Sequence, residues 1–174
     1  QGAGWRAYLR SRWRALPVSK KGEHAQALAR RLLPAMWAGA LLCIALLATP
    51  APFATLAKAD AGRVVAHIFV REAWLSLLLG AALLALARRE AARHAESDQG
   101  SQFSTEMLLA LGAIFCTVMG YFALQPMMAA ARAGEVTPLS FGQLHGLSFG
   151  LFGLKTALVC WLASDDCSFN TGAV

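Results

Sequence analysis

Charged residues are scarce in this chain. They make up 15% of its 174 residues, whereas hydrophobic residues make up 57%. Soluble domains carry about 25% charged and about 45–50% apolar residues. A soluble fold of this length would therefore have to hide an unusually large apolar excess. The mean hydropathy of +0.48 points the same way, and the composition predicts a single-domain integral membrane protein.

Motifs of catalysis and of nucleic-acid binding are also missing. The sequence contains no hydrolase elbow, P-loop, dinucleotide fingerprint or HExxH pair. Its four cysteines form no C-x-x-C pair, and Cys43, Cys116 and Cys160 stand in apolar runs, where cysteine behaves as a small hydrophobe. Half of the sixteen Lys and Arg precede residue 32, rather than marking a nucleic-acid-binding module. We expect neither an enzyme nor a nucleic-acid partner.

What the chain does contain is four long apolar runs, at 32–56, 64–87, 105–131 and 141–163. Each reaches the roughly 20 residues that a helix needs to cross a bilayer. Leu and Ala dominate without period-2 alternation, which indicates helices, and the short connections predict antiparallel neighbours. The predicted fold is all-α: an integral membrane up-down four-helix bundle over 32–163, between a basic arm (1–31) and a short tail (164–174). Pro50, Pro52 and Pro126 should kink or end their helices.

Orientation follows from the basic residues outside the runs. With the N-terminus in the cytoplasm, eleven Lys and Arg lie on the cytoplasmic side, and only Lys58, Arg63 and Arg132 lie on the other. This bias satisfies the positive-inside rule. The alanine-rich, arginine-over-lysine composition is typical of bacteria. We therefore predict a multi-pass protein of the bacterial inner membrane, with both termini in the cytoplasm.

The N-terminal arm has the pattern of an amphipathic helix. Aromatic and aliphatic residues recur about every four positions beside a parallel row of arginines. Such a helix lies in the membrane interface, with indoles at headgroup depth and guanidinium groups on phosphates. The predicted interface anchors are Trp5, Arg6, Leu9, Arg10, Trp13 and Arg14. The alternative is a flexible basic tail.

Two histidines lie inside the apolar runs at similar predicted depth. His67 is near the outer end of the second run and His145 near the outer end of the fourth, so both should lie about 5–6 Å below the boundary. Two facing imidazoles can ligate haem iron, and with nearby methionines they can hold copper. The favoured expectation is structural: each histidine bonds a neighbouring helix and carries no metal or other cofactor.

Four charged residues also fall within the runs, where each is costly. Arg71 lies one turn from His67 and extends its face, while Glu72 should look elsewhere. Glu106 begins the third run, and Lys155 can extend toward it from the fourth. We predict that Glu106 and Lys155 form a buried pair, with Glu72 as the competing partner.

The fourth run has a glycine face. Small residues let transmembrane helices approach closely, so this face predicts helix packing, within this chain or against another. It consists of Gly142, Gly146, Gly150 and Gly153.

Several segments resemble a known family. The run LPAMWAGALLCIALLATPAPFATL, then AGRVVAHIF and FGQLHGLSFG, are similar to the bacterial branch of the transmembrane-protein-205-like family. The resemblance covers about 34–163 and rests on Trp37 with Gly39, Gly62, His67 with Phe69, and His145 with Gly146 and Ser148. It implies four membrane-spanning helices and leaves the biochemical role open.

Together these features favour a non-catalytic accessory subunit. We expect it to be embedded in lipid and to pack against other membrane protein subunits, for example those of an energy-transducing complex. The alternative is a copper- or haem-handling membrane protein that uses His67 and His145.

Overall fold

The computed structural model describes residues 20–96 and 104–168. In these ranges the chain is helical and contains no strand. The elements are α2 (Lys20–Cys43), η1 (Ile44–Ala48), α3 (Pro50–Thr55), α4 (Lys58–Glu96), α5 (Thr105–Thr117), η2 (Val118–Leu124), α6 (Gln125–Arg132) and α7 (Phe141–Ser168). The predicted interfacial helix of the N-terminal arm lies outside the described residues.

Four stretches of these helices are long and apolar enough to cross a membrane, and this confirms the predicted fold class. They are His24–Thr55, Lys58–Ala92, Thr105–Arg132 and Phe141–Ser164. The second begins at Lys58 rather than at residue 64, so Lys58–Arg63 belongs to a helix and not to a connection. Arg63 donates to Asp60 one turn earlier, and this exposed pair supports the first turn of α4.

Two of the spans contain a short π-helical segment, and each segment is followed by proline. Pro50 begins α3 after η1, and Pro126 lies in the first turn of α6 after η2. Proline lacks an N–H, and its ring collides with the carbonyl four residues earlier. The wider π-helical turn relieves that collision, as shown by the bond from the Thr49 N–H to the Ile44 carbonyl, 2.9 Å. The first span therefore continues past Pro50 to Thr55.

The four spans pack in the order of the chain. α2 contacts α4, α4 contacts α5, α5 contacts α7 and α7 returns to α2. This leaves α4 and α7 on one diagonal of the bundle and α2 and α5 on the other. The main core joins the four spans near the end where α2 begins and α7 ends, and it contains Trp37, Ala38, Leu41, Leu83, Leu109, Ala113, Val159 and Leu162.

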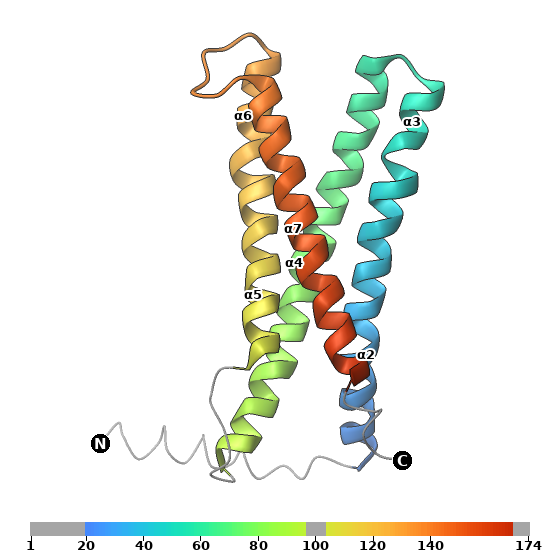
Figure 1. The fold of residues 1–174 in the computed structure, drawn as a ribbon, viewed down its shortest axis with the longest axis vertical. Coiled ribbons are helices and arrows are strands. Elements are labelled where there is room, and N and C mark those ends of the chain that lie inside the picture. Colours follow the sequence, from blue (N-terminus) through green and yellow to red (C-terminus); the bar gives the residue numbers. More distant parts are fainter. Residues whose placement is uncertain (1–19, 97–103, 169–174) are drawn as a thin grey trace, which may run out of the picture.

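Toward the opposite end the bundle divides into two arms (Figure 1). The first arm consists of η1, α3 and the start of α4, and the second consists of η2, α6 and the start of α7. A small cluster of Leu124, Met128 and Leu144 holds the second arm together. η1 and α3 make no backbone contact with η2, α6 or α7, whereas α4 does contact η2. Helix packing therefore leaves the space between the arms open on the side of η1 and α3.

Candidate functional site

A buried ion pair crosses the bundle where the arms separate. Lys155 Nζ on α7 donates to Glu72 Oε1 on α4 at 2.6 Å, and both side chains are only 4% exposed. Ser76, one turn after Glu72, donates to the same carboxylate oxygen. Trp37 Nε1 on α2 donates in turn to Ser76 Oγ at 3.0 Å. The pair is thus part of a chain of hydrogen bonds that links three helices. One oxygen of its carboxylate accepts two of these bonds.

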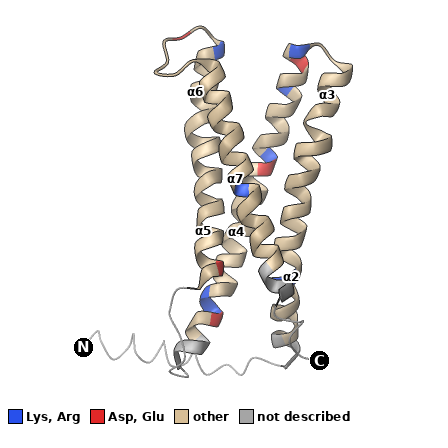
Figure 2. Ribbon diagram, in the orientation of Figure 1, with Lys and Arg blue, Asp and Glu red and all other residues tan. Residues whose placement is uncertain are grey.

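The predicted pairing of Glu106 with Lys155 is wrong. Glu106 accepts instead from Arg30 Nη2 at 2.6 and 2.8 Å, and Glu90 adds a second carboxylate 3.6 Å from Arg30. Depth is the physical reason. α7 continues to Ser168, so Lys155 lies thirteen residues, about 20 Å, from its end. Glu106 lies in the first turn of α5, at the end of the bundle where α7 ends, so the depth of Lys155 separates the two side chains. Figure 2 shows the two charged sites at different levels of the bundle.

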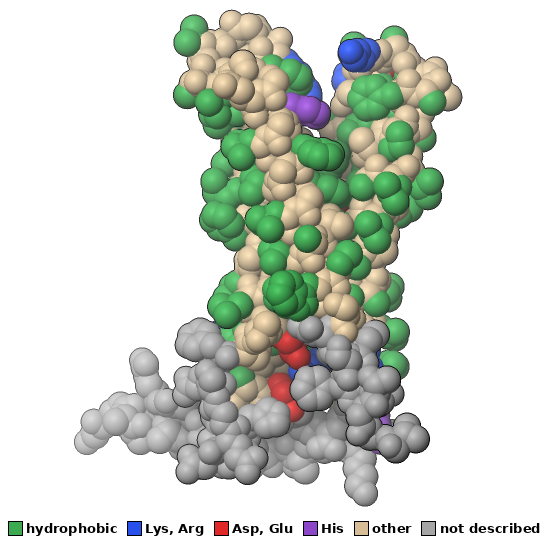
Figure 3. Space-filling view, in the orientation of Figure 1, with side chains coloured by type: hydrophobic (Ala, Val, Ile, Leu, Met, Phe, Trp, Pro, Cys, Tyr) green, Lys and Arg blue, Asp and Glu red, His purple; other side chains and the backbone are tan. Residues whose placement is uncertain are grey.

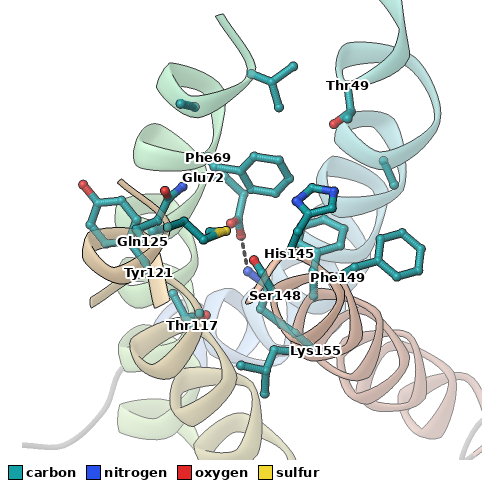
Figure 4. A pocket seen from close by; sticks show the side chains of 18 of the residues that line it. Thr49, Phe69, Glu72, Thr117, Tyr121, Gln125, His145, Ser148, Phe149 and Lys155 are labelled. Atoms are coloured by element: carbon teal, nitrogen blue, oxygen red, sulfur yellow. Dashed lines mark hydrogen bonds and ion pairs between the residues drawn. The ribbon is translucent and has the colours of Figure 1, made fainter. Parts of the chain in front are cut away.

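Between the arms, above the ion pair, lies a cavity of about 370 Å³. Figure 3 shows the bundle hollowed at this end. Four aromatic rings form much of its apolar wall, from Phe53, Phe69, Phe149 and Phe152. Polar side chains from three spans also face it, and Figure 4 shows them around one common space: Thr49, Thr117, Tyr121, Gln125, His145 and Ser148. Glu72 and Lys155 belong to its lining as well.

Most of the polar groups of this cavity have no hydrogen-bond partner among the described residues. Thr117 donates to the Ala113 carbonyl at 2.9 Å. In contrast, the Oγ1 atom of Thr49 is buried and unpaired. The side chains of Tyr121, Gln125 and Ser148 likewise form no hydrogen bond within the described part of the chain. Unsatisfied polar groups at membrane depth are costly, so the accessible polar groups of this cavity require water or another hydrogen-bonding partner.

The structure does not place the two histidines at one site. His145 lines the cavity, and its ring stacks on Phe141 with centroids 6.0 Å apart. His67 is exposed on α4 and is not part of the cavity lining, and Arg71 is exposed like it. Neither imidazole forms the expected hydrogen bond to another helix within residues 20–96 and 104–168. In these ranges no three His, Cys, Asp or Glu side chains form a metal-binding group.

The glycine face of α7 points out of the bundle. A Cβ atom added at Gly142, Gly146, Gly150 or Gly153 would meet no atom within 4 Å. The buried residues Leu144, Lys155 and Val159 occupy the opposite side of the same helix. The predicted packing role of these glycines is therefore not fulfilled within the described chain.

Three features of the site were not predicted from the sequence. In the sequence, the only indication of the Trp37–Ser76 hydrogen bond is that a serine follows one turn after Glu72. Arg30 was assigned to the basic arm, although α2 begins at Lys20 and carries it into the bundle. The cavity depends on the divergence of the arms, which no residue pattern reveals.

These observations define a multi-pass membrane protein with four spans, a buried ion pair and an intramembrane cavity. The chain belongs to the family described as Domain of unknown function (DUF4149), whose model matches residues 32–136. The matched region includes Trp37, Glu72 and Ser76 but ends before α7, which contributes Lys155 and His145. No curated protein and no solved structure matches the chain.

Proposed function

We propose that this protein is a non-catalytic accessory subunit that packs against a transmembrane helix of a larger membrane complex. One observation carries the proposal: the four glycines of α7 form one outward face that nothing in the described chain covers. An energy-transducing complex of the bacterial inner membrane is the partner class that we favour. A relation to the transmembrane-protein-205-like family is consistent with this role.

Contact with lipid alone gives no reason for a face of glycines. A glycine in a helix costs about 1 kcal/mol relative to alanine, and acyl chains gain nothing from its small size. A second helix does gain, because small residues let two backbones approach closely. Exposed bulky residues border the glycine face, among them Leu147, Phe149, Leu154 and Trp161. A groove with apolar walls suits a single helix of a partner.

The copper- or haem-handling alternative has weaker support. It requires His67 and His145 to face one another, and only His145 lines the cavity. We therefore base the proposed function on the glycine face alone.

Photo-crosslinking tests the proposal in native membranes. A photoreactive residue at Leu147, beside the glycines, should give an adduct with a different membrane protein, mapped by mass spectrometry to one of its transmembrane helices. The same residue at Leu78, which is exposed on α4, should not. Gly146→Leu with Gly150→Leu should remove the adduct.

The matched control is Gly39→Leu, a single exposed glycine on α2 whose added Cβ meets no neighbour. This variant should keep the adduct. An adduct between two copies of this chain would replace the accessory role with self-association. An adduct that survives the double glycine substitution, or no adduct at all, would reject the proposal.

A further inference from the structure

We infer that the cavity between the arms binds a small amphiphilic anion, with a phosphate or carboxylate group attached to an apolar tail. This site is separate from the glycine face, and the inference does not depend on the proposed accessory role. The cavity combines unpaired polar groups, apolar walls and an arginine that has no ion pair among the described residues.

The unpaired groups indicate that the cavity is incomplete without a polar occupant. Thr49 Oγ1 is fully buried there and has no partner. Gln125 on the third span and Ser148 on the fourth lie on two sides of the same space (Figure 4). Lys155 donates to only one oxygen of the Glu72 carboxylate, Oε1. An occupant with several hydrogen-bonding atoms would satisfy the accessible groups of Gln125 and Ser148 together.

Size and wall chemistry indicate that the occupant also has an apolar part. Water alone would fill about 370 Å³ with roughly a dozen molecules. Ligand-binding cavities begin at about 300 Å³ and combine apolar walls with a few polar groups. Here Phe53, Phe69 and Phe152 line the cavity with aromatic rings. They would hold an acyl or aryl group better than they would hold water.

The charged residues that line the cavity indicate whether the polar group of its occupant is an anion or a cation. Besides His145, three acidic or basic side chains line the cavity, namely Glu72, Lys155 and Arg132. Glu72 neutralises Lys155, so Arg132 leaves a net positive charge. Arg132 forms no ion pair with the described residues, and its guanidinium lies over the Phe141 ring at 5.1 Å. Arg132 is exposed, so its N–H groups remain available to an anion, which arginine binds through two parallel hydrogen bonds.

Binding of decyl phosphate tests the inference. The full chain, in nanodiscs of phosphatidylcholine, is titrated with decyl phosphate in a calorimeter. We expect saturable one-to-one binding, with much weaker binding of decanol, which lacks the charge, and of inorganic phosphate, which lacks the tail. Failure of decyl phosphate to saturate, or equal binding of decanol, would overturn the inference.

Variants locate the site. Arg132→Gln should weaken binding about tenfold, since it removes a charge-assisted hydrogen bond. Gly120 lines the cavity, and a Cβ there meets no neighbour within 4 Å, so Gly120→Leu should fill the space and abolish binding. Arg71→Gln removes an exposed arginine outside the cavity and should leave the affinity unchanged. Wild-type binding by Gly120→Leu, or an equal loss in Arg71→Gln and Arg132→Gln, would place the anion elsewhere and reject the site.

Two sources could supply this chemistry, an anionic membrane lipid or a free amphiphile. Native mass spectrometry from nanodiscs that contain phosphatidylglycerol distinguishes them. A retained lipid that is lost in Gly120→Leu identifies the lipid as the ligand, whereas saturable decyl phosphate binding without a retained lipid identifies a free amphiphile. The Gly146→Leu with Gly150→Leu variant should bind decyl phosphate normally, so failure here and failure of the accessory role are separate results.

Discussion

Lys155 and Glu72 join two helices that are not neighbours. Their side chains meet at 2.6 Å, although α7 and α4 lie on a diagonal of the bundle and share no backbone contact. A second bond of this kind joins Arg30 on α2 to Glu106 on α5, the other diagonal. The first pair lies at the base of the cavity. It therefore fixes the separation of the helices at the level where the arms begin to diverge.

Glu72→Gln should destabilise the protein strongly. It leaves the Lys155 ammonium buried without a counter-charge, and breaking a buried pair in this way costs about 3–5 kcal/mol. Glu72→Leu with Lys155→Leu removes both charges and should recover most of that loss. Reversible unfolding in mixed micelles, followed by tryptophan fluorescence, measures both. A cost below about 1 kcal/mol for Glu72→Gln would mean that Lys155 reaches water.

The pair at the end of the bundle provides the comparison. Arg30 and Glu106 are 27% and 32% exposed, so their coupling in a double-mutant cycle should not exceed about 1 kcal/mol. Glu106 and Lys155 should show no coupling. A large coupling between Glu106 and Lys155 would contradict the structure and restore the sequence-based pairing.

The fold was predictable because the bilayer limits the choices. Every backbone group must be satisfied within a span, so a long apolar run is a helix. The third and fourth spans begin at Thr105 and Phe141, as predicted. The second span was predicted too short, because hydropathy treats Lys58, Asp60 and Arg63 as a break although the backbone continues as a helix through them. Polar side chains end an apolar run sooner than they end a helix.

The site was less predictable, because it depends on how far each helix is rotated and how deep it lies. Periodicity correctly separated Glu72 from the face of His67 and Arg71. The choice of Glu106 over Glu72 as the partner of Lys155 was wrong, because α7 continues beyond the apolar run and Lys155 therefore lies deeper than that run indicates. The glycines show the same limit. Their spacing indicates a packing face but not which helix covers it.

Gly80 should tolerate substitution worse than any glycine of α7. A Cβ there would lie 2.6 Å from Ile114 Cγ1 and 3.4 Å from Trp37 Cη2, within the main core. Gly80→Ala should therefore cost about 1–3 kcal/mol through overpacking. Ile114→Ala in the same chain removes the colliding atom and should restore part of the loss.

Gly39→Ala is the matched control for Gly80, since its new methyl group meets no neighbour. It should be neutral or should stabilise α2 by up to about 1 kcal/mol, because alanine favours helix. The same unfolding assay reports both variants. Equal effects at Gly80 and Gly39 would show that helix propensity, not the contact with Ile114, decides the outcome.

The last prediction concerns orientation. By the positive-inside rule, the basic residues predict that the loop between α6 and α7 lies outside the cytoplasm and that both termini lie inside it. Val136 is fully exposed in that loop, at 103%, so Val136→Cys offers an accessible thiol. In a chain whose native cysteines are replaced by serine, this thiol should react with a membrane-impermeant maleimide added to spheroplasts. Cys167, kept as the only thiol in a second variant, should react only after the membrane is opened. If the two thiols exchange these behaviours, the chain has the opposite orientation, and the basic residues near α2 and at the end of α4 do not set its topology.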